Sequence, residues 1–372
     1  MAENINFITD ITQQTITIDG CTYTARDCRE RLYEDFCRLH GTDGFHARLA
    51  EFLQEWFDPS DTVRVHTSGS TGTPKELYVE KRRMMASAMM TVDFLGLQKG
   101  DTALLCMPLQ YIAGKMVVVR SLVAGLNLLP VTPSGHPLKD LSEAPVFAAM
   151  IPMQVFNALQ VPAEQALLKD VRQLIIGGGS IDASLGEALK TFPHAVWSTY
   201  GMTETLSHIA MRRLNGPMSS EWYTPFPGVS ISTGPEGTLV IQAPTVNPDT
   251  LVTNDIVEFD AQGRFRILGR RDNTINTGGV KVQIEQVEDA LRPRLPFPFA
   301  ITSVPDAKFG ERIVLLVENA RTDDPLLSQA IAALPPYWRP KQVFSVPQLP
   351  QTGTGKPDRA TARKLARELL EA

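Results

Sequence analysis

Short apolar runs alternate with helical patterns over the middle of the chain, and this alternation limits the folds that it can adopt. Runs typical of buried strands occur at Thr102–Met107, Leu126–Val131, Val146–Met150, Arg172–Ile176 and Ala195–Ser198. Helical periodicity occurs between them at Ile112–Ala124, Pro152–Leu159 and Ala183–Thr191. Strands and helices that alternate at this spacing predict a βαβ sheet with helices packed on its faces, so the expected fold class is α/β.

The pattern changes after Ile209. Short strands separated by turn residues continue as far as Leu268, and they predict a small β-rich subdomain. Beyond Gly269–Asp272, mixed strands and helices predict an α+β domain of about a hundred residues. We therefore expect a large N-terminal domain over residues 1–271, in which βαβ sheets are joined by the small β subdomain, and a smaller C-terminal domain over residues 272–372.

Composition and charge exclude several classes of function. Apolar residues make up 43% of the chain and the net charge is -5, so the chain is globular in composition and has no overall attraction to nucleic acid or anionic membrane. No run of about 18 apolar residues is present, and the N-terminus lacks the features of a signal peptide. The cysteines (Cys21, Cys28, Cys37 and Cys106) match no metal-binding spacing, which predicts free thiols in a reducing cytosol. A cytoplasmic protein without a membrane span or nucleic-acid partner is expected.

The stretch Arg64–Lys75 has the composition of an anion-binding loop. Strand-like runs flank it, and its core contains the residues Thr67, Ser68, Gly69, Ser70, Thr71 and Gly72. The glycines let backbone N–H groups turn towards an anion, the hydroxyls add donors, and Lys75 adds a positive charge. The Walker phosphate-loop pattern does not fit, because Pro74 precedes the lysine. A polar surface hairpin explains this loop equally well when the loop is taken alone.

Other motifs follow strands but are weak individually. Gly177–Gly179 could cup a ring or a phosphate, although a tight turn is the commoner meaning of such a run. Glu204, in Tyr200-Gly201-Met202-Thr203-Glu204, could bind magnesium, which prefers hard oxygen ligands, or could simply cap a loop. Asp255 could accept bonds from a ribose diol or sit in a turn. Arg270 and Lys356 are each compatible with a solvated surface position.

Taken in order, these motifs resemble the adenylate-forming superfamily of acyl-CoA synthetases, luciferases and peptide-synthetase adenylation domains. The resemblance covers roughly residues 60 to 360. It implies that a carboxylate attacks the α-phosphorus of ATP, which releases pyrophosphate and leaves an acyl-adenylate, and that a thiol such as that of coenzyme A then displaces AMP. The catalysis would consist of positioning and charge stabilisation.

The resemblance also implies residue roles. The loop with Thr67, Ser68, Gly69, Ser70, Thr71, Gly72 and Lys75 would hold the β- and γ-phosphates, and Gly177, Gly178, Gly179, Tyr200 and Gly201 would line the adenine pocket. Thr203 would touch the α-phosphate, Glu204 would bind Mg²⁺, and Asp255 and Arg270 would hold the ribose. Lys356 would join the α-phosphate to the substrate carboxylate. The C-terminal domain would be mobile, with Asp272 as its hinge and Gly278 and Gly279 near the CoA thiol.

Within the superfamily, the chain most resembles the o-succinylbenzoate–CoA ligases of menaquinone biosynthesis. Thr253-Asn254-Asp255 and Thr277-Gly278-Gly279-Val280-Lys281 carry this resemblance. Arg120 matches an arginine that faces the second carboxylate of the substrate, with a helix-surface arginine as the equal alternative. Tyr111 stands near the acyl group, where the family often has histidine.

Three other functions share some of these sequence features. A ligase for another aryl or fatty acid and a non-catalytic nucleotide-binding relative remain alternatives, and a P-loop kinase is set aside because no Gly-Lys-Ser/Thr follows a strand. The expected partners are ATP, a carboxylic acid and CoA, and a homo-oligomer is compatible with them.

Overall fold

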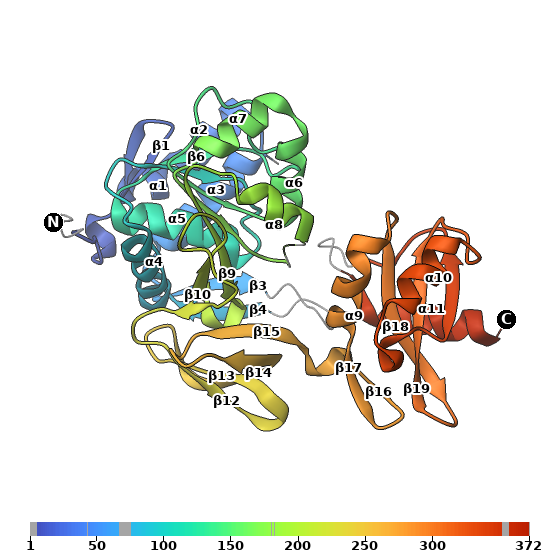
Figure 1. Cartoon of the computed structure of the whole chain (residues 1–372). Helices are drawn as coiled ribbons and strands as arrows, with labels where there is room; N and C mark the ends of the chain where they lie inside the picture. Colours follow the sequence, from blue (N-terminus) through green and yellow to red (C-terminus); the bar gives the residue numbers. More distant parts are fainter. Residues whose placement is uncertain are drawn as a thin grey trace. The chain divides into compact units, whose positions relative to one another are not determined.

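The computed structural model describes residues 6–42, 44–66, 76–179, 181, 183–351 and 357–371 (Figure 1). It divides into two compact units. The first comprises Met1–Ser230 and Gln242–Thr250, and the second comprises Ile231–Ile241 and Leu251–Ala372. The expected α/β class with a smaller C-terminal part is confirmed. The predicted domain boundary at 271/272 stays a prediction, although the second unit also takes in most of a four-stranded β-sheet that we assigned to the N-terminal domain.

A nine-stranded sheet with the order β11-β10-β9-β8-β7-β5-β6-β1-β2 forms the centre of the first unit. Its central strands are parallel, whereas β2, β10 and β11 join antiparallel at the two edges. The strands are β1 (Thr15–Ile18), β2 (Cys21–Thr24), β5 (Thr102–Leu105), β6 (Asn127–Pro130), β7 (Phe147–Met150), β8 (Gln173–Ile176), β9 (Ala195–Gly201), β10 (His208–Arg213) and β11 (Thr224–Pro225). The parallel arrangement brings the carboxyl ends of β7, β8 and β9 to one edge of the sheet, where open α/β sheets bind ligands.

Helices of this unit include α4 and α5, which pack against each other, and α5 occupies the predicted range Ile112–Ala124 (Figure 1). Most of α5 is buried, and its close approach to the preceding loop requires glycine, since a Cβ on Gly114 would lie 2.6 Å from the Pro108 carbonyl oxygen. Near the N-terminus two helices follow each other and break at Arg31. The helices are α1 (Ala25–Glu30), α2 (Leu32–His40), α3 (Phe45–Trp56), α4 (Lys81–Leu95), α5 (Ile112–Ala124), α6 (Pro152–Gln160), α7 (Pro162–Asp170) and α8 (Ala183–Leu189).

The predicted anion-binding loop connects two paired strands, β3 (Thr62–His66) and β4 (Glu76–Glu80). Val63 and Val65 of β3 are completely buried, which anchors the strand that leads into the loop. Residues 67–75 themselves lie outside the described residues. The expectation that two strands flank the loop is therefore confirmed, while its phosphate-binding role stays a prediction.

The second unit contains two sheets. The four-stranded sheet has the order β12 (Ser230–Thr233), β13 (Thr238–Ala243), β14 (Asn247–Phe259) and β15 (Phe265–Arg270). The second sheet joins β17 (Val280–Gln283), β16 (Thr274–Thr277), β19 (Gly310–Glu318) and β18 (Phe299–Asp306), with β20 (Gln342–Val346) also paired to β19. The helices are α9 (Ile284–Leu291), α10 (Pro325–Ala332) and α11 (Arg359–Glu371). Two apolar clusters form the core of this C-terminal part, one around Leu315 and one around Leu316, because adjacent residues of β19 point to opposite faces.

Candidate active site

The triple glycine lies at the carboxyl end of β8, as the sequence predicts. A Cβ on Gly177 would collide with the Thr199 hydroxyl of neighbouring β9, and Gly178 has a φ of +78°, so both positions favour glycine. Gly179 packs near Pro152 at the start of α6. The tight approach of three chain segments explains the glycines structurally, and the same small residues leave backbone accessible for a flat ligand.

Tyr200 follows on β9, and its side chain is buried. Its ring contacts that of Tyr223 with centroids 6.0 Å apart and an interplanar angle of 60°. The Tyr223 hydroxyl is in turn 2.7 Å from the Ser198 hydroxyl. A Cβ on Gly201 would collide with the Ser207 carbonyl oxygen, so the chain crosses itself tightly here. Packing against Tyr223 therefore holds the Tyr200 ring in one orientation.

Thr203 and Glu204 lie on a short 3₁₀ helix, Thr203–Thr205, directly after β9. The buried Thr205 fixes this turn, because its hydroxyl donates to the Ser207 carbonyl oxygen at 2.7 Å and accepts from the Met202 N–H at 3.0 Å. Asn247 also donates to the backbone oxygen of Glu204 at 2.9 Å. The Glu204 side chain itself is exposed and makes no bond to any described residue. A turn fixed by these bonds therefore presents a hydroxyl and a carboxylate directly after β9, the strand that pairs with β8.

A magnesium ion fits this carboxylate in chemical type. Within the described ranges, no group of three or more His, Cys, Asp or Glu side chains gathers to hold a metal. Magnesium usually takes only one or two protein carboxylates, with water and substrate phosphates as its other ligands. Glu204 could fill that role, and it would need a phosphate to complete the site.

In the second unit, three predicted residues come together. Asp255 of β14 pairs in register with Arg270 of β15, and Arg270 Nη1 donates to Asp255 Oδ1 at 3.2 Å. The same guanidinium donates to both Asp272 oxygens, from Nε and from Nη2, at 2.9 Å each. The hydrogen bonds to Asp272 raise the pKa of Arg270. The predicted ribose-binding residues and the predicted hinge residue therefore share one ion-paired cluster.

Gly278 and Gly279 form the turn between β16 and β17. Both have positive φ values, +61° and +80°, so the turn needs glycine for its own geometry. The Gly278 N–H donates to the Phe309 carbonyl oxygen at 2.8 Å. A role of this turn at a CoA thiol stays a prediction.

Arg120 is the most unusual residue of the first unit. It lies on α5 with only 2% of its surface exposed, so it is not the helix-surface arginine of the alternative interpretation. Its Nη2 donates to the Ser207 hydroxyl at 2.6 Å, whereas among the described residues its Nε has no hydrogen-bond partner and no carboxylate pairs with the guanidinium. Burial lowers the pKa of Arg120 to about 9, which still leaves it charged near neutral pH.

Sequence reasoning missed the residues around Arg120. Ser207 and His208 follow the predicted Thr203-Glu204 pair by only a few positions, and Thr91 lies far away on α4. The position of Ser207 just after a recognised motif was the one available signal. Tyr111, also predicted near the substrate, is the residue that precedes the first turn of α5.

Some predicted residues fall elsewhere. Outside the described residues lie Thr67, Ser68, Gly69, Ser70, Thr71, Gly72, Lys75 and Lys356.

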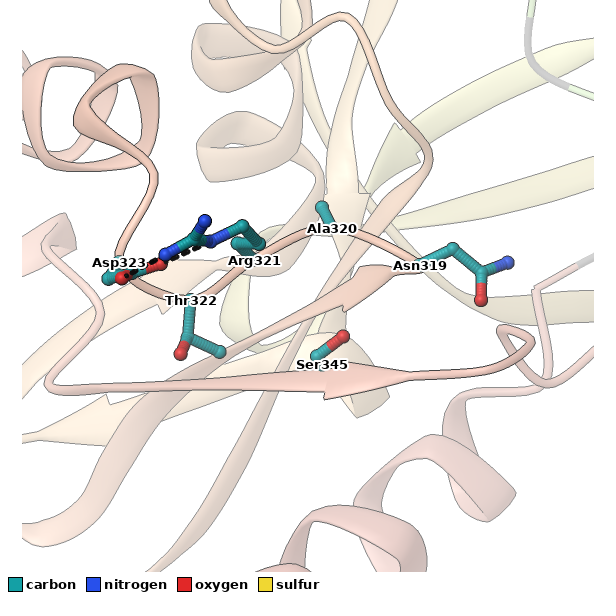
Figure 2. Close-up of a pocket in the computed structure, with 6 residues that line it drawn as sticks. All are labelled: Asn319, Ala320, Arg321, Thr322, Asp323 and Ser345. Atoms are coloured by element: carbon teal, nitrogen blue, oxygen red, sulfur yellow. Dashed lines mark hydrogen bonds and ion pairs between the residues drawn. The ribbon is translucent and has the colours of Figure 1, made fainter.

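A shallow pocket of about 570 Å³ is lined by Asn319, Ala320, Arg321, Thr322, Asp323 and Ser345 (Figure 2). It contains no predicted site residue, and its one cation, Arg321, already pairs with Asp323 at 2.8 Å.

The remaining expectations from composition can be compared with the structure. Cys28 and Cys106 are buried, all four cysteines are free, and burial raises the pKa of each of these two thiols to about 12. None of the helices in the described part of the chain has the length and apolar character that crossing a bilayer requires.

Comparison with known proteins defines the class to which this fold and site correspond. The model of the AMP-binding enzyme family matches residues 14–236, and the chain belongs to that family. It is similar to a protein of Mycobacterium tuberculosis named probable 2-succinylbenzoate–CoA ligase, with 30% identity over 84% of this chain and 87% of the relative. A 2-succinylbenzoate–CoA ligase of Bacillus cereus is 25% identical over 85% of this chain and 73% of its own length.

Solved structures agree at the level of the fold. An acyl-CoA synthetase (AMP-forming)/AMP-acid ligase II-like protein from Dyadobacter fermentans superimposes with a TM-score of 0.60 and 32% identity, over 88% of this chain and 97% of that one. The o-succinylbenzoate coenzyme A synthetase of Bacillus subtilis, solved with ATP and magnesium, gives a TM-score of 0.66 at 20% identity, over 80% and 69% of the two chains. The predicted resemblance to the adenylate-forming superfamily is confirmed.

Proposed function

We propose that this protein is an ATP-dependent acid–CoA ligase that converts o-succinylbenzoate to o-succinylbenzoyl-CoA in menaquinone biosynthesis. The reaction proceeds through an acyl-adenylate, takes ATP with Mg²⁺, and releases pyrophosphate and AMP. Membership of the AMP-binding family and the names of the relatives from two genera support this assignment. A cytoplasmic location follows from its soluble substrates, ATP and CoA.

The buried guanidinium of Arg120 is the observation that carries the choice of acid. A buried cation without an anion is unfavourable, because only a well-placed anionic partner offsets the free-energy cost of removing the cation from water. The N–H groups of a guanidinium form a fork that matches the two oxygens of a carboxylate, and the Nε of Arg120, which has no partner among the described residues, belongs to such a fork. o-Succinylbenzoate has two carboxylates, so one can be activated while the other pairs with Arg120. A fatty acid or a simple benzoate has no second anion to offer.

The first half-reaction makes and breaks bonds at the α-phosphorus of ATP. An oxygen of the substrate carboxylate bonds to this phosphorus while the bond to the bridging oxygen breaks, and pyrophosphate leaves. Thr203 donates to the α-phosphate, and Glu204 holds Mg²⁺, which neutralises phosphate charge when bound. Tyr200, fixed by Tyr223, and the Gly177–Gly179 backbone hold the adenine ring.

Other residues bind the ribose and the remaining phosphates of ATP. Asp255 accepts from the ribose hydroxyls and Arg270 donates to them. The β- and γ-phosphates are bound by the loop residues Thr67, Ser68, Gly69, Ser70, Thr71, Gly72 and Lys75. Lys356 joins the α-phosphate to the attacking carboxylate. A single well-placed donor of this kind is typically worth roughly 10²–10³ in rate.

The second half-reaction transfers the acyl group to a thiol. The CoA sulfur bonds to the acyl carbon, AMP leaves with the bond electrons, and the thiol proton passes to solvent. Rotation of the C-terminal domain about Asp272 withdraws Lys356 and brings the Gly278–Gly279 turn to the thiol. Lys356→Ala is therefore expected to lose adenylation but to keep thioester formation from a supplied acyl-adenylate.

Pyrophosphate release with ATP and Mg²⁺ tests the proposal. The acids are o-succinylbenzoate, benzoate, 4-coumarate and medium-chain fatty acids, each with and without CoA, and Lys356→Ala is the control. Strongest turnover with o-succinylbenzoate, yielding its CoA thioester, supports the assignment. Preference for another acid would support the adenylate-forming reaction but contradict o-succinylbenzoate as the substrate. ATP binding without turnover of any acid points to a non-catalytic relative.

A further inference from the structure

A chain of hydrogen bonds leads from Arg120 through the loop after β9 to helix α4. Arg120 Nη2 donates to the Ser207 hydroxyl at 2.6 Å, and this hydroxyl lies 3.2 Å from His208 Nδ1. On the other side of the ring, His208 Nε2 lies 2.9 Å from the Thr91 hydroxyl, which donates to the Ser87 carbonyl oxygen at 3.2 Å. The chain connects α5, β10 and α4 through polar groups in an otherwise apolar region.

One assignment of protons satisfies every donor in this series of hydrogen bonds. When the Thr91 hydroxyl donates to the Ser87 carbonyl oxygen, it accepts from His208, and Nε2 then carries the hydrogen. In a neutral ring Nδ1 is then an acceptor, and it takes the proton of Ser207. Ser207 is left to accept from Arg120. The opposite tautomer would make Ser207 accept two donors and leave its own proton without an acceptor in this chain.

Burial supports the neutral ring. His208 is 7% exposed and Thr91 is fully buried. Desolvation, followed by the nearby positive charge of Arg120, lowers the pKa of His208 well below its usual value. The ring of Phe226 closes one side of the imidazole, with centroids 5.5 Å apart. The residue is therefore held in one orientation and one protonation state.

We propose that His208 and Thr91 are positioning residues: they hold the Ser207 hydroxyl as an acceptor for Arg120, and so direct the unpartnered Nε edge of Arg120 towards the second carboxylate of the substrate. This inference rests on the proposed function and deepens it. Neither residue contacts the substrate carboxylate. Their effect passes through the rotation of one hydroxyl, which points its proton away from the guanidinium only while Nδ1 is available to accept it.

Enzyme kinetics with matched acids test whether this series of hydrogen bonds affects recognition of the second carboxylate. Two monoacids each lack one carboxylate of o-succinylbenzoate: 4-oxo-4-phenylbutanoate and 2-butanoylbenzoate. The readout is kcat/KM for the diacid divided by that for whichever monoacid turns over. We expect His208→Leu to lower this ratio about tenfold, as loss of a hydrogen bond to a charged group does, with the KM for ATP unchanged. His208→Asn, which keeps an acceptor near the Nδ1 position, should restore most of the ratio.

Variants of Thr91 and a control serine separate positioning from general disturbance of the core. Thr91→Val removes the acceptor for Nε2 without changing volume and should lower the ratio, whereas Thr91→Ser should keep it. Ser121→Ala is the matched control, because Ser121 is a buried serine next to Arg120 that donates only within α5, to the Val117 carbonyl oxygen. Its ratio should equal that of the wild type. Equal losses in Ser121→Ala and His208→Leu, or no loss in His208→Leu and Thr91→Val, would overturn the proposal.

A spectroscopic measurement tests the chain independently of the substrate. Nitrogen-15 spectra of histidine-labelled protein, with His208→Asn to assign the signal among the six histidines, should show a neutral His208 with its proton on Nε2 between pH 6 and 8. Thr91→Val should shift the population towards Nδ1–H. A wild type that lacks diacid preference but shows this tautomer would refute the proposed function and the role of His208 in recognising the second carboxylate, while the hydrogen bonds themselves would stand. A protonated His208 ring or an Nδ1–H tautomer would refute the proposed direction of the hydrogen bonds from His208 to Ser207 and Thr91.

Discussion

Arg120 in the first unit and Arg270 in the second are both expected to touch a substrate, yet their surroundings are opposite. Arg270 is 38% exposed at its side chain and is ion-paired to two aspartates, Asp255 and Asp272, and these contacts raise its pKa. Arg120 is 2% exposed, pairs with no described carboxylate, and has its pKa lowered to about 9 by burial. Carboxylates of the described residues balance the charge of Arg270, and none of them balances that of Arg120.

This difference separates two kinds of recognition. Because Arg270 is already paired, it can exchange hydrogen bonds with a neutral ribose at little net change in charge. Arg120 gains most from a ligand that carries a negative charge, since the low dielectric around it strengthens such a pair. We therefore assign nucleotide binding, which is common to the family, to the paired arginine, and acid selectivity to the unpaired one.

The largest expected effect is that of Arg120→Leu. We expect kcat/KM for o-succinylbenzoate to fall roughly 10²-fold or more, because a desolvated charge pair with substrate is lost. Thermal stability should rise, since an apolar side chain replaces a buried cation that has no ionic partner. Pyrophosphate release and thermal unfolding measure the two quantities. Arg120→Lys, which keeps the charge but not the fork, should recover only part of the activity; unchanged selectivity in Arg120→Leu would break the comparison.

Arg270→Ala should act on the nucleotide and not on the acid. We expect the KM for ATP to rise about tenfold, as for loss of charge-assisted bonds, while the preference among acids stays that of the wild type. Stability should change little, because the ion pairs that it loses are partly solvated. Initial rates over a range of ATP concentrations measure the first effect. A change in acid preference would show that the two arginines do not divide the task as described.

Stability should depend on pH through His208, next to Arg120. Its lowered pKa means that the folded protein excludes a proton that the unfolded chain accepts below about pH 6.5. The resulting stabilisation is present above that pH and is lost as the pH falls below it, by at most about 1.4 kcal/mol per pH unit. Denaturant unfolding at pH 7.5, 6.5 and 5.5 should show a steeper loss in the wild type than in His208→Asn. Parallel curves would mean that His208 titrates normally.

The smallest effect is expected from Asp272→Asn. This change weakens the competitor for the Arg270 guanidinium, so more of Arg270 is available to the ribose. We expect the KM for ATP to fall about twofold to threefold, in line with the modest strength of exposed ion pairs. Asp249→Asn, an exposed aspartate on β14 without a predicted role, is the control. An increase in the KM for ATP would instead show that Asp272 orients Arg270 for binding.

Local signals in the sequence predicted much of the fold. The predicted helix Ile112–Ala124 is α5, and the predicted strand Val146–Met150 contains β7 (Phe147–Met150). Strand β14 runs without interruption from Asn247 to Phe259, although Pro248 and Asp249 resemble turn residues, because pairing within the sheet makes this segment extended. The break at Arg31 likewise has no strong local signal.

The candidate site was predicted where it follows a motif and missed where it depends on tertiary contacts. The Asp255–Arg270 pair lies on two strands joined by a short turn, so their proximity follows from the hairpin. The contact of Arg120 with Ser207 spans 87 positions, and that of Thr91 with His208 spans 117. No periodicity or spacing encodes such contacts. Only the packing of α4 and α5 against the sheet brings these polar groups together.

The most direct test of the central claim is the selectivity of the wild-type enzyme between o-succinylbenzoate and the two monoacids that each lack one of its carboxylates. We predict that kcat/KM for ATP-dependent pyrophosphate release favours the diacid by roughly 10²-fold or more over the better monoacid, as expected when a buried cation meets its anion. Equal turnover of the diacid and a monoacid would contradict the account, because Arg120 would then have no role in recognising the second carboxylate.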